Sequence, residues 1–96
     1  SETEDEAMYE VYIVECADGT LYTGIARDAE RRLAVHNRGQ GAKYTRSRLP
    51  VVLRYRERQP DKSAALRREM AIKKLSREAK LALIGTYQKE RNRPER

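Results

Sequence analysis

The segment of residues 8–16 restricts the fold more than any other part of the sequence. It reads Met-Tyr-Glu-Val-Tyr-Ile-Val-Glu-Cys, with β-branched and aromatic residues at both odd and even positions. Successive side chains of a strand point to opposite faces of a sheet, so this pattern predicts a strand that is covered on both faces. A chain of 96 residues has room for one thin core. We therefore expect the strand and the elements that cover it to form a single domain.

A turn and a helix follow this strand. Ala17-Asp18-Gly19 is a turn signal, and residues 20–25 read as the returning strand. Asp28 is a plausible N-cap, and apolar residues then recur at helical spacing, which predicts a helix over about 28–38. Residues 37–50 have no period and contain no acid, so they read as a basic, glycine-containing loop.

The second half of the chain predicts one more strand and two helices. A half-buried strand lies between Pro50 and Pro60. A helix over about 62–74 follows, capped by Asp61 or Ser63, and Ser76 begins another over about 77–87. The order β-β-α-β-α-α is typical of an α+β domain with a small, largely antiparallel sheet flanked by helices.

Composition narrows the classes of protein. No apolar run approaches the length of a membrane span, and the first residues are acidic rather than a basic signal sequence, so we expect a soluble, cytoplasmic chain. Cys16 is the only cysteine, which excludes an internal disulfide and a multi-cysteine zinc site. Residues 1–7 are expected to be disordered. Residues 8–87 are expected to form the domain, and residues 88–96 a charged tail.

The charge distribution favours a polyanionic partner. The formal net charge is +6, and all four acids of the first seven residues precede the predicted domain, so residues 7–96 carry +10. A body this basic suits nucleic acid first and an anionic membrane surface second.

The hairpin decides whether two tyrosines share a face. With Asp18-Gly19 as a two-residue turn, Tyr12 and Tyr22 point to opposite faces. With a three-residue loop that has Gly19 in the left-handed region and a G1 bulge, Cys16 pairs with Thr20 and Tyr12 faces Gly24. The two hydroxyls then lie on one face, and the missing side chain at Gly24 leaves a gap beside Tyr12.

Three further residues are candidates for chemistry. Glu69 lies in the middle of the apolar stripe of its predicted helix, where a carboxylate needs either an arginine partner or a divalent metal. Arg32 and His36 are four residues apart and project from one helix face. Each alone reads as a surface or core-edge residue, but together they could hold a phosphate.

Five separated elements resemble the GIY-YIG nuclease superfamily, in its small, stand-alone bacterial (UPF0213-like) branch. They are Val11-Tyr12-Ile13, Leu21-Tyr22-Thr23-Gly24-Ile25, the predicted helix of residues 28–37, Gly39-Gln40-Gly41-Ala42-Lys43-Tyr44-Thr45 and Ala65-Leu66-Arg67-Arg68-Glu69. The resemblance implies a three-stranded antiparallel sheet flanked by helices, one Mg²⁺ or Mn²⁺ ion, and hydrolysis of DNA phosphodiesters.

The same resemblance implies a role for each matching position. It implies that the catalytic residues are Tyr12, Tyr22, Arg32, His36 and Glu69, with Glu69 also the metal ligand and Gly24 the glycine of the second motif. The first motif reads Glu10-Val11-Tyr12 and the second Tyr-Thr-Gly, and the asparagine that some members carry after the metal glutamate has no equivalent.

The loop of residues 38–48 is the predicted nucleic-acid contact. Its glycines allow main-chain N–H groups to approach phosphate, Tyr44 could stack on a base, and the basic residues Arg38, Lys43, Arg46 and Arg48 supply charge. Such contacts position a backbone without reading its sequence, so we expect little sequence selectivity, on DNA that is duplex, branched, damaged or single-stranded, or on RNA. Two alternatives are a non-catalytic nucleic-acid-binding module with the same fold and a protein that docks partners.

Overall fold

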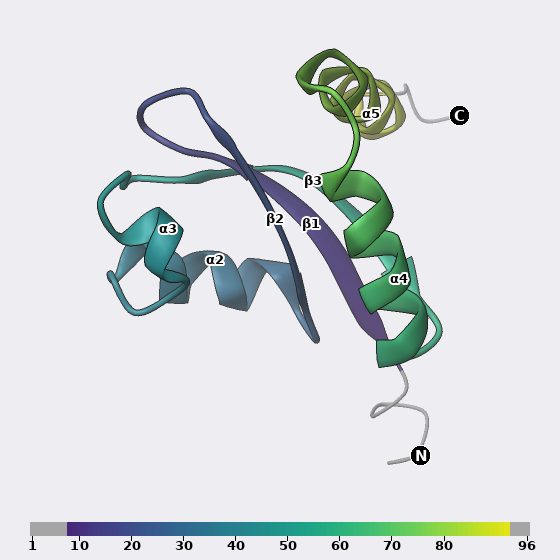
Figure 1. The fold of residues 1–96 in the computed structure, drawn as a ribbon, viewed down its shortest axis with the longest axis horizontal. Coiled ribbons are helices and arrows are strands. Elements are labelled where there is room, and N and C mark those ends of the chain that lie inside the picture. Colours follow the sequence, from purple (N-terminus) through teal and green to yellow (C-terminus); the bar gives the residue numbers. More distant parts are fainter. Residues whose placement is uncertain (1–7, 93–96) are drawn as a thin grey trace.

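The computed structural model describes residues 8–92 and has the expected α+β architecture. A three-stranded antiparallel sheet has the order β2-β1-β3. Figure 1 shows α2 and α3 on one side of this sheet and α4 and α5 on the other. The elements are β1 (Tyr9–Glu15), β2 (Leu21–Ala26), α2 (Ala29–Asn37), α3 (Lys43–Arg46), β3 (Val52–Gln59), α4 (Lys62–Lys73) and α5 (Arg77–Arg91).

The central strand β1 is covered on both faces, as its sequence predicts. Residues 11–14 are at most 1% exposed. Val11 and Ile13 belong to the core beneath α4 and α5, whereas Tyr12 and Val14 belong to a second core beneath α2. Because alternate side chains of one strand supply both cores, β1 links the two helical layers.

The hairpin between β1 and β2 has the three-residue loop with a G1 bulge. Gly19 has a φ of 86°, its N–H donates to the Cys16 carbonyl at 2.9 Å, and the Cys16 N–H donates to the Thr20 carbonyl at 2.8 Å. In the resulting register Tyr12 lies opposite Gly24. Since Val14 lies opposite Tyr22, the two tyrosines share one face of the sheet.

Three predicted helix caps are confirmed. The Asp28 carboxylate accepts hydrogen bonds from the Glu30 and Arg31 N–H groups at 3.0 and 3.3 Å. Asp61, one of the two candidates for the next helix, accepts from the Ala64 N–H at 2.8 Å. The Ser76 hydroxyl accepts from the Ala79 N–H at 3.1 Å. Each cap satisfies a backbone donor that has no partner within its helix.

The predicted secondary structure needs correction in two places. The basic loop contains a one-turn helix, α3, which is held by tertiary contacts of Thr45 that no sequence period reveals. α5 runs on to Arg91, into the segment predicted to be a tail. Lys89 and Arg91 suit its last turn, where the helix dipole favours positive charge. The predictions for residues 1–7 and for the chain end beyond Asn92 lie outside the described residues.

No helix within residues 8–92 is long and apolar enough to cross a bilayer.

Candidate active site

A chain of buried hydrogen bonds joins β1, α2 and α3. The Tyr12 hydroxyl lies 2.9 Å from His36 Nε2, and His36 Nδ1 lies 2.9 Å from Thr45 Oγ1. Thr45 donates its single hydroxyl proton to the Ala42 carbonyl at 2.9 Å. Thr45 therefore accepts from His36, which places the imidazole proton on Nδ1. Nε2 of the neutral ring is then an acceptor, and Tyr12 is its donor.

The pKa shifts agree with this arrangement. Burial lowers the pKa of His36, and the positive charge of Arg32 lowers it further. Burial raises the pKa of Tyr12 to about 12, with a further increase from Tyr22 and Glu69 that Arg32 opposes. At neutral pH His36 is therefore uncharged and Tyr12 keeps its proton, so the hydrogen bond between them has the donor and acceptor assigned above.

Two glycines leave room for these side chains. A Cβ atom at Gly24 would lie 2.7 Å from Tyr12 Oη and 2.9 Å from its Cζ. A Cβ atom at Gly41 would collide with the ring of His36, at 2.8 Å from its Cγ. Gly24 was expected from the strand register. Gly41 lies in one of the family-like segments, but its tight contact with His36 was not predicted from the sequence.

Tyr22 lies between the imidazole and the loop. Its ring meets that of His36 edge-on, with centroids 5.7 Å apart, and stacks on Tyr44 with centroids 6.0 Å apart and an interplanar angle of 18°. Arg48 places its guanidinium carbon 3.9 Å from the Tyr44 centroid. A cleft of about 260 Å³ opens beside the two tyrosines. Its lining includes Lys73 and Lys80.

Arg32 supplies positive charge next to this relay. It lies one turn before His36 on α2 and is partly buried. Its charge lowers the pKa values of both Tyr12 and His36. Within residues 8–92 no carboxylate forms an ion pair with Arg32, which leaves its guanidinium available for an anionic ligand.

Glu69 approaches the same region from the opposite helical layer. α4 contacts both β1 and the edge strand β2. The negative charge of Glu69 contributes to the raised pKa of Tyr12, and Lys73 on the next turn of α4 lines the cleft beside Tyr22. The Glu69 side chain is 15% exposed, and Oε2 lies 3.3 Å from the ammonium of Lys73, one turn away. Lys73 is half exposed, so solvent reaches this pair.

The predicted apolar stripe of this helix is partly wrong. Leu66 and Met70 are 42% and 58% exposed, whereas Ala65 and Ile72 are fully buried. α4 therefore packs through the face that carries its small alanine, and Glu69 lies at the border of that face rather than in its middle. The Glu69 carboxylate pairs with Lys73 rather than with an arginine.

The residues fit a hydrated divalent cation better than a closed metal site. Within the described part of the chain no group of three or more His, Cys, Asp or Glu side chains could hold a metal. Glu69 would be its one protein ligand near the relay. Mg²⁺ commonly keeps several waters and binds through one or two carboxylates and substrate phosphates, so a single carboxylate is compatible with it.

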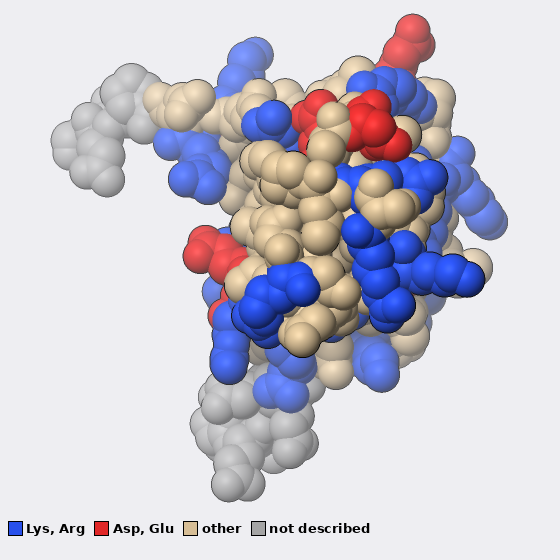
Figure 2. Space-filling view, turned by 90° about the vertical axis from the view of Figure 1, so that its left-hand side faces the viewer, with Lys and Arg blue, Asp and Glu red and all other residues tan. Residues whose placement is uncertain are grey.

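Of the basic residues of the predicted nucleic-acid loop, Lys43 and Arg46 lie on α3, Arg48 follows it, and Arg38 is the C-cap of α2. Arg48 donates to Asp18 at 3.1 Å and to the Tyr44 carbonyl at 2.7 Å, and Arg46 donates to the Gly41 carbonyl at 3.2 Å. Arg38 donates to Gln40 at 3.3 Å, while Lys43 is exposed. Figure 2 shows Lys and Arg side chains spread over this side of the molecule, with fewer acids. Arg46 and Arg48 thus also shape the loop.

Thr45, Gly41 and the acid Glu10 lie in family-like segments of the sequence, but no contact at the site was predicted for any of them. Glu10 accepts from the Ala29 N–H at 2.7 Å and forms two hydrogen bonds with Arg56, at 2.9 and 3.0 Å. The three contacts join segments that are distant in sequence. For Glu10 the sequence offered one indication of such a contact: it is an acid within a strand whose apolar residues occupy both odd and even positions.

Comparison with known proteins gives consistent matches. Residues 8–82 match the family described as the GIY-YIG catalytic domain. A UPF0213 protein of Halobacterium salinarum is 58% identical over 80% of this chain and all of its own length. A UPF0213 protein of Staphylococcus aureus is 58% identical over 77% of this chain and 90% of its own length.

Two solved structures have the same fold. The UPF0213 protein BH0048 of Bacillus halodurans has a TM-score of 0.54 and 44% identity over 82% of this chain and 84% of its own. The protein EF2693 of E. faecalis has a TM-score of 0.58 and 36% identity over 97% and 99% of the two chains.

Proposed function

We propose that this chain, which belongs to the GIY-YIG catalytic domain family, is a metal-dependent endonuclease that hydrolyses DNA phosphodiester bonds. One observation carries the proposal. The buried relay of Tyr12, His36 and Thr45 lies within electrostatic reach of a guanidinium on one helical layer and a carboxylate on the other, and both charges shift the pKa of Tyr12. Such a hydrolysis needs three groups: an acceptor for the proton of the attacking water, a ligand for the phosphate, and a ligand for the metal.

Tyr12 and His36 would activate the attacking water together. With a pKa of about 12, Tyr12 is a poor base at neutral pH by itself. As water attacks phosphorus, its proton passes to Tyr12 Oη while the Tyr12 proton passes to His36 Nε2. The new P–O bond forms as the bond to the leaving oxygen breaks, and solvent protonates that oxygen. His36 becomes imidazolium, and its Nδ1–H continues to donate to Thr45 Oγ1.

Arg32 would bind the phosphate and control the basicity of His36. Its fork of N–H donors can hold two phosphate oxygens and stabilise the charge that develops on them. In the free protein the charge of Arg32 disfavours a second cation at His36. A bound phosphate would offset that charge, so the imidazole would gain basicity when substrate is present. Tyr22 would then orient the water or phosphate from the edge of the His36 ring.

Glu69 would hold Mg²⁺ or Mn²⁺ at the mouth of the site. When bound, the cation would polarise the phosphate and stabilise the leaving oxygen. Lys73 competes for the same carboxylate, so its ammonium must move away or share Glu69 with the cation. Both side chains reach solvent, which gives Lys73 room to do so.

The residues around the site favour contacts with the nucleic-acid backbone over contacts that read the base sequence. The cleft beside Tyr22 and Tyr44 carries two lysines, and aromatic rings can stack on any base. The basic groups around α3 would neutralise phosphates on that side. We propose DNA as the substrate, with little sequence selectivity and RNA as the alternative to be tested.

A cleavage assay tests this function. DNA duplex, branched and single-stranded substrates and their RNA counterparts are incubated with Mg²⁺ or Mn²⁺ and compared with chelated samples. Glu69→Gln and Arg32→Gln should each abolish most cleavage, whereas Glu78→Gln, a change on the exposed start of α5, should leave it intact. Cleavage that survives both site variants, or that ignores chelation, contradicts the mechanism.

The second candidate is a binding module without turnover. The ion pair between Lys73 and Glu69 favours it, because it already neutralises the proposed metal ligand. Binding of nucleic acid that is unchanged in Glu69→Gln, with no cleavage by the wild-type chain under any metal condition, would select this candidate.

A further inference from the structure

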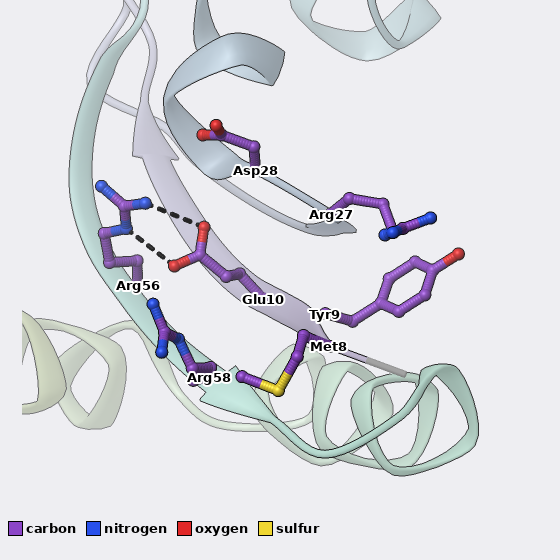
Figure 3. A pocket seen from close by; sticks show the side chains of 7 residues that line it. All are labelled: Met8, Tyr9, Glu10, Arg27, Asp28, Arg56 and Arg58. Carbon is purple, nitrogen blue, oxygen red and sulfur yellow. Dashed lines mark hydrogen bonds and ion pairs between the residues drawn. The ribbon is translucent and has the colours of Figure 1, made fainter. Parts of the chain in front are cut away.

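We propose that the pocket at the end of the sheet nearest Arg27 is a second phosphate subsite, which holds nucleic-acid backbone away from the reacting bond. This strand-end pocket has a volume of about 530 Å³ and is lined by Tyr9, Glu10, Arg27, Asp28, Arg56 and Arg58. Figure 3 shows Arg27 and Tyr9 on one side of it and Arg56 and Arg58 on the other. The identity of its ligand rests on the proposed function.

The acids of the pocket are already engaged. The Glu10 carboxylate, only 11% exposed, binds the Arg56 guanidinium and the Ala29 N–H. Asp28 caps α2 through two backbone N–H groups. Arg56 also binds Glu30 at 2.8 Å. These contacts give the carboxylates of Glu10 and Asp28 hydrogen-bond donors within the fold, so neither is left as an unsatisfied acceptor facing an incoming anion.

Arg58 is not neutralised by the acid opposite it. The register places Arg58 on β3 directly across from Glu10 on β1. Both oxygens of Glu10 are occupied by Arg56, and among residues 8–92 no ion pair joins Arg58 to a carboxylate. Arg27 lies across the pocket, with its guanidinium 5.8 Å from the centroid of the Tyr9 ring. Two exposed guanidinium groups thus flank one hollow, an arrangement that suits phosphate.

The pocket adjoins a second hollow that extends to Arg32 of the candidate active site. This second hollow has a volume of about 380 Å³, shares Arg27 and Asp28 with the pocket and reaches Arg31 and Arg32 on α2. The cleft at Tyr22 lies beside the start of β2. The strand-end pocket and the second hollow lie at the end of β2. Because β2 is an edge strand, a polynucleotide can follow it past the relay.

The spacing fits a backbone. At roughly 3.3 Å per strand residue, Arg27 lies about 10 Å along the chain from Gly24, which is far enough for it to contact a phosphate other than the one beside Tyr12. The subsite would therefore engage phosphates beyond the one that is cut. It would add affinity without reading sequence.

The test measures binding without metal, so that no cleavage is required. The affinity for a 20-base-pair duplex, a length chosen so that both sites are covered, is measured over a range of salt concentrations. The variants are the double Arg27→Gln/Arg58→Gln change and, as a matched control, Lys89→Gln on the exposed end of α5. A third variant, Arg27→Lys/Arg58→Lys, keeps both charges.

The double glutamine variant should reduce the slope of log K against log salt by about 0.9 for each lost contact and weaken binding equally across sequences. The lysine variant and Lys89→Gln should keep the slope. An unchanged slope in the glutamine variant, or an equal loss in the Lys89 control, overturns the subsite. If the wild-type chain cleaves DNA while the slope is unchanged, only the subsite fails. If the slope changes as expected but no cleavage occurs, only the hydrolase fails.

Discussion

The backbone of Gly41 packs against the imidazole of His36 so closely that no side chain fits between them. A Cβ atom there would also lie 2.9 Å from the His36 Cα, which belongs to the backbone of α2 and cannot turn aside. Gly41 therefore fixes the loop against the helix. In this position it holds Thr45 within hydrogen-bond distance of the ring, and so sets which nitrogen carries the proton.

Gly41→Ala should destabilise the domain by about 1–3 kcal/mol, because the methyl group overpacks a filled site. It should also lower cleavage, because His36 must shift away from Tyr12 or Thr45. Thermal or denaturant unfolding measures the first effect. Gly85→Ala is the control: it lies within α5, meets no atom within 4 Å, and should stabilise the helix by about 0.4–1 kcal/mol. Equal effects of the two changes would contradict the packing role of Gly41.

His36 should make stability depend on pH. Burial holds its pKa in the folded chain below the value of about 6.5 expected in the unfolded chain. Between those two values the unfolded chain binds the proton and the folded chain does not, so stability falls as the pH drops below about 6.5 and levels off beneath the folded pKa. Cleavage should fall over the same lower range, because an imidazolium cannot accept the Tyr12 proton.

The measurement is direct because His36 is the only histidine in the sequence. NMR titration of its ring gives the folded pKa, and denaturant unfolding from pH 5 to 8 gives the stability profile, a range chosen around the ordinary histidine value. His36→Gln should lose this part of the pH dependence. A folded pKa above that of the unfolded chain would contradict the neutral acceptor.

Tyr12→Phe should separate the relay from simple packing. The change leaves the buried Nε2 of His36 without its donor, which costs about 1–3 kcal/mol of stability. Cleavage should fall on the order of 10²-fold or more. Tyr22→Phe keeps the edge-on ring contact with His36, so its effect on unfolding should be smaller. If both variants lose the same free energy of unfolding, the hydrogen bond from Tyr12 to His36 does not contribute to stability as proposed.

Sequence patterns predicted the parts of this structure that depend on local chemistry. The Asp18-Gly19 turn contains a residue suited to a positive φ, and the register that follows places Tyr12 opposite Gly24. The burial of both faces of β1 was predicted because apolar residues occupy both the odd and the even positions of its sequence. Capping side chains located three helix starts because they satisfy backbone donors within a few residues.

The remaining features depend on contacts between distant segments. Helical spacing in α4 indicated an apolar stripe but could not show that Ala65, rather than Leu66, faces the sheet. Thr45 and Gly41 contact His36 only after the loop folds back on α2, and no periodicity marks them. The pair of Glu10 with Arg56 joins β1 to β3 across the sheet and is likewise invisible in either strand alone.

Lys73 should control access of a divalent cation to Glu69. Its ammonium lies 3.3 Å from the carboxylate and is half exposed, so the pair contributes little to stability. A divalent cation bound at Glu69, about 4 Å from this charge, would be repelled by it at about 2 kcal/mol in a water-like dielectric, which corresponds to about a thirtyfold loss of affinity. Lys73→Gln should therefore tighten Mn²⁺ binding by up to about thirtyfold, and Glu69→Gln should abolish it. Mn²⁺-induced relaxation of NMR signals measures this binding without substrate, with Lys62→Gln at the other end of α4 as the control. Equal tightening in both lysine variants would mean that net charge acts rather than this pair, and Mn²⁺ binding that survives Glu69→Gln would place the cation elsewhere.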